Sequence, residues 1–466
     1  MLETIHLYHT NDLHSHFENW PQTAQFIKKK RQEHEQNGEQ MILVDIGDHA
    51  DRFHLITEAT KGQANVDMLN DLQYDAVTIG NNEGITFSHE DLDALYKRAD
   101  FPVVLSNIYN EFNERPEWVT PYHFIQLKNG MKLCLLGVTV FYEKFYKLLG
   151  WKVTDPFQSL VHTVNQVKDK ADIIVLLSHL GISDDEIIAQ EFLDIQLILG
   201  GHTHHVLENG KEINQTLLAG AGKYGQYVGH VKLDFHAQEK LLVSKTAMLH
   251  SMEREETCKE TEVWLATQYQ KSEELLSEPV VVLHEDLSLD WFQDSAFPSL
   301  MASAIREWCE GEVSMVNAGM LLEPLKSGVV TKKDLHRICP HPINPCKVEI
   351  KGDVLQEVII QSREKRMEAL QLKGLGFRGK VMGRMVFDGI EVSTVTLSDG
   401  KEHVNKIIVN GEPIDLDRIY SVATVDMFTL GPLYPEISHA KKKTYYMPEM
   451  LRDLLAWKLR KIPYNE

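Results

Sequence analysis

The chain has 466 residues, more than a single hydrophobic core usually supports, so we expect two domains. It carries 48 basic and 68 acidic side chains, a formal net charge of −20. This charge argues against a nucleic-acid polymer as substrate, because a phosphate backbone is bound through clustered Lys and Arg. No apolar run approaches the roughly 20 residues of a membrane helix, so no membrane span is predicted.

Five short apolar or β-branched runs in the first half of the chain are typical of buried strands. They cover residues 5–9, 41–44, 75–79, 173–177 and 195–199. Each run leads directly into a cluster of polar side chains. Ligands of open α/β sheets bind beyond the carboxyl ends of the strands, so we expect the five clusters to converge on one place.

The clusters contain seven side chains that can bind metal ions: Asp12, His14, Asp48, Asn81, His179, His202 and His204. A lone histidine near a strand is more often structural, but this ordered set mixes carboxylate, amide and imidazole donors, which suit cations such as Zn²⁺ or Mn²⁺. Two ions about 3.5–4 Å apart need a shared carboxylate, and Asp48 is the natural bridge. The sequence therefore predicts a two-metal hydrolase.

In chain order the clusters read Asn-Asp-Leu-His (11–14), Gly-Asp (47–48), Gly-Asn-Asn-Glu (80–83), Ser-His (178–179) and Gly-His-Thr-His (201–204). This order resembles the calcineurin-like metallophosphoesterases, and within them the bacterial 5'-nucleotidase family, which includes UDP-sugar hydrolases and 2',3'-cyclic nucleotide phosphodiesterases. The resemblance implies an α/β fold, with a four-layer α/β/β/α sandwich followed by a C-terminal α/β substrate-binding domain. It also implies two divalent ions (Mn, Zn, Co or similar), one held by Asp12, His14, Asp48 and His204, the other by Asp48, Asn81, His179 and His202.

The third cluster departs from the family pattern. The family reads Gly-Asn-His-Glu followed by Asp, and that His, oriented by the Asp, donates to the scissile phosphate. This chain has Asn82 at the position of the His and Ile85 at that of the Asp. A missing general acid forfeits roughly 10²–10⁴-fold in rate, but an amide can still donate a hydrogen bond to a phosphoryl oxygen. We therefore expect an altered enzyme in which Asn82 is catalytic.

A polar loop follows the expected bridging carboxylate and contains His49, Asp51, Arg52 and His54. Arg52 is the expected phosphate clamp, because its guanidinium fork matches two phosphate oxygens. The alternative is a solvated loop with no part in catalysis, and the sequence does not decide between them.

The second half carries weaker signals of a substrate pocket. Val316-Asn317-Ala318-Gly319 resembles the family's Asn-x-Gly-Gly loop, but Leu322 stands where the family has Arg. The expected substrate-binding residues are Asn317, Phe377, Arg378, Arg384 and Tyr434. The two rings are candidates to stack on a nucleobase, with burial in the domain core as the alternative.

Residues 255–276 lack Gly and Pro and place charged and apolar residues at helical spacing, which predicts a bridging helix. We expect a dimetal domain at 1–255, a linker helix at 256–279 and a 5'-nucleotidase C-terminal, substrate-specificity domain at 280–466. The sequence does not predict an oligomeric state.

Together these features predict metal-dependent hydrolysis of a small-molecule phosphate ester, foremost a nucleotide phosphomonoester in nucleotide catabolism. The alternatives are a phosphodiester or pyrophosphate substrate, such as a cyclic nucleotide or nucleotide sugar, and a metal-bound sensor with weakened catalysis. The first strand begins near residue 4 without a secretory signal pattern, and the five cysteines lack CxxC spacing, so a cytoplasmic protein is expected.

Overall fold

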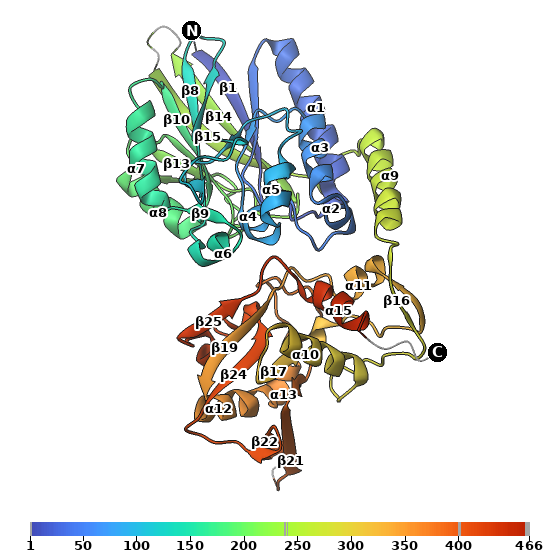
Figure 1. The fold of residues 1–466 in the computed structure, drawn as a ribbon. Helices are drawn as coiled ribbons and strands as arrows, with labels where there is room; N and C mark the ends of the chain where they lie inside the picture. Colours follow the sequence, from blue (N-terminus) through green and yellow to red (C-terminus); the bar gives the residue numbers. More distant parts are fainter. Residues whose placement is uncertain (1, 237–238, 240, 399–401, 462–466) are drawn as a thin grey trace. The chain divides into compact units, whose positions relative to one another are not determined.

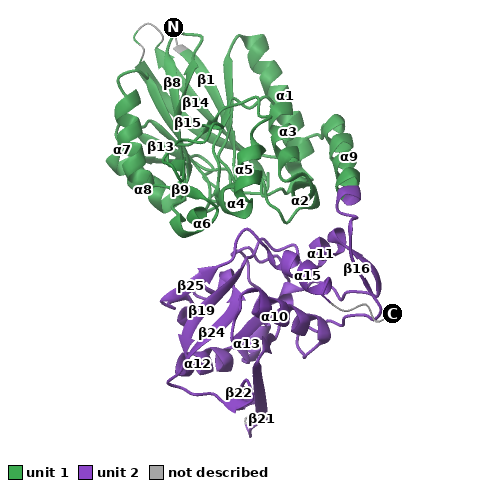
Figure 2. Ribbon diagram, in the orientation of Figure 1, with its two compact units in different colours: residues 1–272 green, residues 273–466 purple. Residues whose placement is uncertain are grey.

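The computed structural model describes residues 2–236, 239, 241–398 and 402–461. The chain divides into two compact units, residues 1–272 and 273–466 (Figure 2). Each unit has its own sheets and its own hydrophobic core.

The first unit contains two large sheets. The seven-stranded sheet has the order β15 (Leu241–Ser251), β14 (Tyr227–His236), β1 (Leu2–Thr10), β2 (Gln40–Asp45), β3 (Ala76–Val77), β4 (Val103–Val104) and β6 (Val119–Thr120). The six-stranded sheet has the order β12 (Lys211–Ile213), β13 (Thr216–Ala219), β11 (Leu197–Gly200), β10 (Ile173–His179), β8 (Lys132–Thr139) and β7 (Tyr122–Gln126). The strands β1, β2 and β3 are parallel, as are β8, β10 and β11.

Alternating side chains of β10 separate two layers of the core. Val175 and Leu177 pack with Leu7 and Val44 of the other sheet, whereas Ile174 and Leu176 belong to the cluster that contains residues of α7 (Pro156–Val167) and α8 (Ile182–Glu191). Successive side chains of a strand point to opposite faces, so one strand contributes to both layers.

The outer face of the seven-stranded sheet is covered by α1 (Trp20–Asn37) and α3 (Gln63–Asp71), on the side opposite to α7 and α8 (Figure 1). The ring of Tyr8 in β1 meets Phe26 of α1 edge-on, with 6.0 Å between centroids. The predicted four-layer α/β/β/α sandwich is therefore confirmed.

The five predicted strands exist, with two differences. β3 is only two residues long and β11 begins at Leu197, two residues later than expected. The strands that carry the clusters belong to both sheets: β1, β2 and β3 lie in one sheet and β10 and β11 in the other. The clusters still meet, because the two sheets pack face to face.

Shorter elements complete this unit: η1 (Phe17–Asn19), α2 (Leu55–Thr60), α4 (Asn81–Thr86), α5 (His89–Leu95), α6 (Glu143–Leu148) and the pair β5 (Ile108–Asn110) and β9 (Trp151–Val153). The helix α9 (Lys259–Leu275) occupies the segment in which the sequence predicts a helix, and the division between the units falls within it.

The second unit is built on the five-stranded sheet β20 (Met385–Asp388), β17 (Val313–Asn317), β24 (Ile419–Val425), β19 (Pro345–Lys351) and β25 (Lys442–Tyr445). Two smaller sheets pair β16 (Pro279–Leu283) with β18 (Gly328–Thr331), and β21 (Ile390–Thr396) with β22 (Glu402–Val409) and β23 (Glu412–Pro413). Its helices are α10 (Ala296–Trp308), α11 (Lys332–Ile338), α12 (Gly352–Ser362), α13 (Lys365–Glu368), α14 (Pro435–Ser438) and α15 (Leu451–Leu459), with the single turns η2 (Ala318–Met320) and η3 (Asp426–Phe428). Within the described part of the chain, no helix combines the length and apolar character needed to cross a bilayer.

Candidate metal centre

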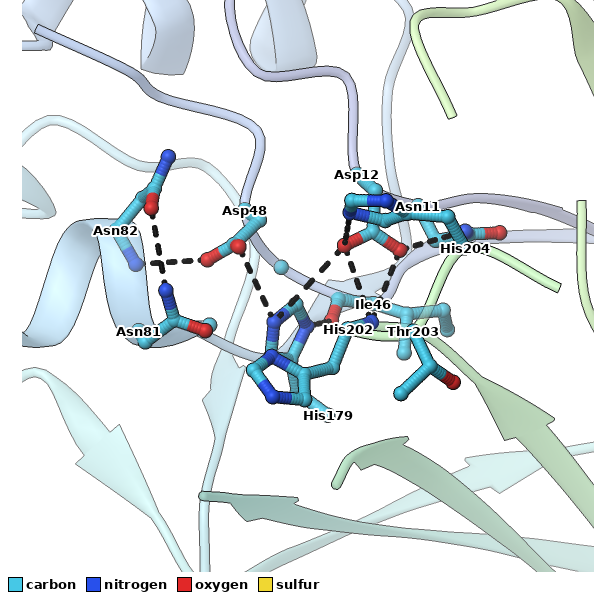
Figure 3. A network of polar contacts seen from close by, with 12 residues as sticks. Asn11, Asp12, Ile46, Asp48, Asn81, Asn82, His179, His202, Thr203 and His204 are labelled. Carbon is cyan, nitrogen blue, oxygen red and sulfur yellow. Dashed lines mark hydrogen bonds and ion pairs between the residues drawn. The ribbon is translucent and has the colours of Figure 1, made fainter. Parts of the chain in front are cut away.

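Two groups of carboxylate and imidazole side chains gather at the carboxyl ends of the central strands (Figure 3). Within each group the donor atoms lie within 4.8 Å of one another. The first group is Asp12, His14 and His204, and the second is Asp48, His179 and His202. These groups contain the six carboxylate and imidazole side chains that the sequence predicts as ligands, and the seventh, Asn81, is the first residue of α4.

The loops that carry these residues have an unusual backbone. Five of the six have a positive φ: Asp12 (50°), His14 (49°), Asp48 (50°), His202 (69°) and His204 (58°). Residues other than glycine rarely adopt this conformation, which costs of order 1–3 kcal/mol each and tends to cluster at functional sites. The sharp turns point side chains from neighbouring positions toward one place.

Asp48 lies between the two groups. Its Oδ2 is 3.3 Å from Nε2 of His179 and 3.7 Å from Nε2 of His14, which belongs to the other group. Its Oδ1 accepts the backbone N–H of Asn82 at 2.7 Å. This position suits the carboxylate shared by two ions.

Asp12 joins the loops that follow β1 and β11. Both of its oxygens accept the backbone N–H of His202 at 3.0 Å, and Oδ1 lies 3.4 Å from Nε2 of His204. The side-chain amide of Asn11 donates to Oδ2 at 2.8 Å. The carboxylate is therefore held in one orientation.

The hydrogen bonds of His179 leave one nitrogen for a metal ion. Its Nδ1 donates to the carbonyl of Ile46 at 2.7 Å, so the lone pair is on Nε2. Apart from the 3.3 Å contact with Asp48, this buried Nε2 has no hydrogen-bond partner among the described residues, and the buried Oδ1 of Asn81 has none. Buried acceptors are normally satisfied, so these two atoms fit a site that binds a cation.

Gly80 leaves the space between these donors open. A Cβ added at this position would lie 2.0 Å from Oδ1 of Asp48 and 2.5 Å from Nε2 of His179. Any larger residue would displace both donors, so the glycine of the Gly-Asn pair is required by close approach.

The charged side chains in this region change one another's pKa values. Burial opposes ionisation of Asp48, but His179 and His14 hold its pKa below the usual range. Burial likewise opposes protonation of His14, but Asp51 and Asp48 raise its pKa above the usual value. The centre therefore keeps ionised carboxylates in a buried place, a charge that divalent cations can balance.

Glu83 supports the loops of this centre, a role that was not predicted from the sequence. Its Oε2 accepts the backbone N–H groups of Asp48 and Gly80, both at 3.0 Å, and its Oε1 accepts that of Ala50 at 2.8 Å. One buried carboxylate thus ties the loop after β2 to the loop after β3. Its place in the Gly-Asn-Asn-Glu cluster is the one feature of the sequence that indicates this role.

Asn82 and Asp51 both contact His14. Nδ2 of Asn82 lies 2.8 Å from Nδ1 of His14, and Oδ2 of Asp51 lies 3.4 Å from the same nitrogen. The other end of the Asn82 amide accepts from Asn81 at 3.2 Å. A carboxylate behind a ligating histidine fixes its tautomer, so Asp51 supports the centre.

The guanidinium of Arg52, the predicted phosphate clamp, is engaged by protein groups. Its Nε and one terminal nitrogen donate to the two oxygens of Glu58 at 2.8 and 3.1 Å, and its other terminal nitrogen donates to the carbonyl of Thr86 at 2.8 Å. The bidentate pair with Glu58 uses the fork that we had assigned to a phosphate.

The predicted substrate-binding rings of the second unit are buried in its core, the alternative that the sequence left open. Phe377 stacks on His341 with 5.3 Å between centroids, and Tyr434 packs edge-on against Phe428 at 4.9 Å. Neither ring presents an open face to a base, because each is at most 3% exposed.

The three polar candidates of this unit are also partly engaged. Asn317 is buried and donates to the carbonyl of Met382 at 2.7 Å, while its Oδ1 has no partner among the described residues. Arg384 lies among three carboxylates, at 3.5 Å from Asp294, 3.5 Å from Glu368 and 3.8 Å from Glu402. Arg378 donates its backbone N–H to His341 at 2.9 Å.

Known proteins resemble the whole chain. The metallophosphoesterase YunD of Bacillus subtilis, itself uncharacterized, is 53% identical over 460 residues, which cover 98% of this chain and all of that protein. Two solved structures share the fold: a candidate 5'-nucleotidase of Staphylococcus aureus in complex with alpha-ketoglutarate (TM-score 0.70, 19% identity, 99% of this chain and 98% of that one), and the NAD nucleotidase of Haemophilus influenzae (TM-score 0.69, 16% identity, 99% and 96%).

Facing sheets whose strand ends carry two Asp/His groups define a class of metal-dependent hydrolases. The calcineurin-like phosphoesterase family matches residues 5–206, and the 5'-nucleotidase C-terminal domain matches residues 277–432. The chain belongs to the calcineurin-like metallophosphoesterase family, with a 5'-nucleotidase C-terminal domain, and is a phosphate-ester hydrolase. The resemblance seen in the sequence is confirmed.

Proposed function

We propose that this protein hydrolyses phosphomonoesters of nucleotides with two divalent ions. The observation that carries the proposal is the shared position of Asp48 between two three-residue donor groups, with unpartnered acceptors on His179 and Asn81. Asp12, His14, Asp48 and His204 would hold one ion, and Asp48, Asn81, His179 and His202 would hold the other. When bound, the pair polarises the phosphoryl group and activates water.

The protonation of His14 decides what Asn82 does. A ligating Nε2 leaves the proton on Nδ1, which then donates to Asp51 and no longer accepts from Asn82. The side-chain N–H groups of Asn82 are thereby released to donate to a phosphoryl oxygen where negative charge develops. Asn82 thus supplies a hydrogen bond, without proton transfer, at the position of the family's histidine.

The second unit recognises the leaving group in this proposal. Its match to the 5'-nucleotidase C-terminal domain supports this role. The nucleotide substrate is supported by the names of similar proteins, a candidate 5'-nucleotidase and a NAD nucleotidase. A cytoplasmic location is supported by five buried cysteines that are all free thiols.

A substrate panel tests the proposal. The protein, loaded in turn with Mn²⁺, Zn²⁺ and Co²⁺, is assayed with p-nitrophenyl phosphate, bis-p-nitrophenyl phosphate, nucleoside monophosphates, a 2',3'-cyclic nucleotide and a nucleotide sugar. We expect the highest kcat/KM on a nucleoside monophosphate. Preference for the cyclic nucleotide or nucleotide sugar would replace the monoesterase by a phosphodiesterase or pyrophosphatase. Metal binding without turnover would identify a sensor.

A further inference from the structure

A third group of side chains that could hold a metal ion lies on the outer face of the seven-stranded sheet. It consists of His6 in β1, His34 in the last turns of α1, and Glu39, directly before β2. Four residues of β1, roughly 13 Å, separate His6 from Thr10 at the end of the strand, and Asp12 lies in the turn beyond it. The group is therefore distinct from the candidate hydrolytic centre.

The donor atoms of this group are close enough to share one ion. One nitrogen of each histidine and a carboxylate oxygen of Glu39 lie within 4.8 Å of one another. Nε2 of His6 is 3.5 Å, and Nδ1 of His34 is 2.8 Å, from Oε2 of Glu39. Donors about 2.0–2.1 Å from a tetrahedral ion lie roughly 3.4 Å apart, so a small opening of the His34–Glu39 contact makes room.

One donor has no other use in the structure. Nε2 of His6 is buried without a hydrogen-bond partner among the described residues, and the residue is 6% exposed. The His6 and His34 rings stack with 3.8 Å between centroids and 25° between planes. The unpartnered nitrogen of His6 therefore faces the same carboxylate as His34.

The second nitrogens of both rings are held by other side chains, as in known metal sites. Nδ1 of His6 lies 3.0 Å from Nε2 of His230, whose Nδ1 lies 3.3 Å from Nε2 of His250. Nε2 of His34 lies 2.9 Å from the hydroxyl of Tyr8. If each ring donates outward along these contacts, the lone pairs of His6 Nε2 and His34 Nδ1 both point at the Glu39 group.

The helix cap of α1 creates this juxtaposition. Gly38 has φ 74°, and its N–H donates to the carbonyl of Glu35 while the N–H of Glu39 donates to that of His34. The left-handed turn reverses the chain, which returns Glu39 to the side of His34. The carboxylate is about one-third exposed, so an ion can enter from solvent.

The charges around this group include some that favour a bound cation and one that opposes it. Burial and the neighbouring His34 lower the pKa of His6 to about 4, so His6 is neutral and can bind a metal at pH 7. Lys232, paired with His6 across β1 and β14, opposes a cation, while Glu39 and Asp234 favour one. Burial and His6 also keep His230 neutral by lowering its pKa.

We propose that His6, His34 and Glu39 form a third metal site, which binds Zn²⁺ or a similar borderline divalent ion with water as the fourth ligand. The ion connects β1, the end of α1 and the start of β2. It stabilises the outer layer of the sandwich and takes no part in hydrolysis. The alternative is a metal-free hydrogen-bond network of histidines.

Metal counting on the full chain separates the two. The protein is stripped with a chelator, saturated with Zn²⁺ and freed of excess, and the bound zinc is measured by mass spectrometry. We expect Glu39→Gln and His6→Gln each to bind one ion fewer per chain than the parent. Glu33→Gln, in the turn before His34, is the matched control and should bind as many as the parent.

Thermal stability of Glu39→Gln is a second measurement, and it does not require the His6 variant to fold. Because Glu39 is partly exposed, Glu39→Gln should fold, retain the hydrolytic rate of the parent, and lose the rise in Tm that Zn²⁺ gives through this site. Equal zinc content in the parent and Glu39→Gln, with equal rises in Tm, would overturn the third site and leave the hydrogen-bond network. Because the zinc content of Glu39→Gln is compared with that of the parent, the result does not depend on how many ions the hydrolytic centre binds.

Discussion

Nδ2 of Asn82 lies 2.8 Å from Nδ1 of His14, which joins the residue that most separates this chain from its family to a candidate metal ligand. Asn82 is also fixed through its backbone, because its N–H donates to Asp48 at 2.7 Å. The side-chain amide of Asn82 can therefore donate a hydrogen bond toward the candidate metal centre in place of the family's histidine.

Replacement of Asn82 by alanine tests this role. Asn82→Ala should lower kcat about 10²-fold and change KM less, because one donor to the developing negative charge is lost. Metal content should stay the same. Steady-state kinetics with p-nitrophenyl phosphate measure both constants, and Asn70→Ala, an amide at the end of α3 that bonds Arg98, is the control. Parental activity in Asn82→Ala would make Asn82 a structural turn residue.

The family's histidine and aspartate can be restored. Asn82→His combined with Ile85→Asp should raise monoesterase turnover, and the pH profile should gain a new limb set by the imidazole. The single Asn82→His change is the control, since the histidine then lacks its orienting carboxylate. A double variant slower than the parent, at unchanged metal content, would show that the region around Asp51 and His14 no longer accommodates an imidazole.

That the predicted ligands lie close together could be expected from the sequence, because each lies at or shortly after the end of a strand. Metal chemistry requires these residue types, and a strand end is visible as an apolar run before a polar cluster. The sequence did not predict which strand belongs to which of the two sheets, because a buried apolar run fits either sheet. The pairing of neighbouring strands is decided by packing over the whole unit.

The sequence also did not predict the partners of Glu83 and Arg52, or the burial of the two aromatic rings. Glu83 acts on three backbone N–H groups, which leave no pattern of side chains in the sequence. Arg52 pairs with Glu58, and its charge gave no indication of whether a protein carboxylate or a phosphate would be its partner. Phe377 and Tyr434 are aromatic in either role, so only their burial in the structure distinguishes core from surface.

The bridging position of Asp48 predicts the effect of its removal. Asp48→Asn should lose at least one ion per chain and lower hydrolysis by more than about 10²-fold, since even residues behind metal ligands affect activity by 10–100-fold. Metal analysis and circular dichroism together check that the ion, and not the fold, is lost. Asp67→Asn, which removes a surface ion pair with Arg98, is the matched control. Full metal content and normal turnover in Asp48→Asn would refute the bridge.

The second unit should lose stability as pH rises because of Asp426. Burial raises the pKa of this carboxyl to about 7, against an ordinary value near 3.9 in the unfolded chain. The folded state therefore holds the proton more tightly. The contribution of the Asp426 carboxyl to the free energy of unfolding is fully present below about pH 4. It is lost as the pH rises through 7, a change of up to roughly 4 kcal/mol.

Hydrogen exchange of β24 amides at pH 5 and pH 8, corrected for intrinsic rates, measures this change. The stability of Asp426→Asn relative to the parent should increase with pH, because the amide stays neutral. The carboxyl accepts the N–H of Asn344 at 3.2 Å, and asparagine keeps an acceptor oxygen for it. A difference between the two proteins that does not vary with pH would contradict the raised pKa.

Glu83 should support both the fold and the metal centre. In Glu83→Gln, one oxygen and one NH₂ group face the three backbone N–H donors of Asp48, Gly80 and Ala50, so at least one donor loses its acceptor and meets another donor. We expect a loss of about 2 kcal/mol in stability and a 10–100-fold loss in metal affinity, because the loop that carries Asp48 is no longer fixed. Urea unfolding and metal titration measure the two effects. Glu58→Gln weakens the partly buried pair with Arg52, and Glu58 has no contact with Asp48, so this variant should lower stability alone. If both variants keep the metal affinity of the parent, then the Glu83 carboxylate serves the fold and does not position Asp48.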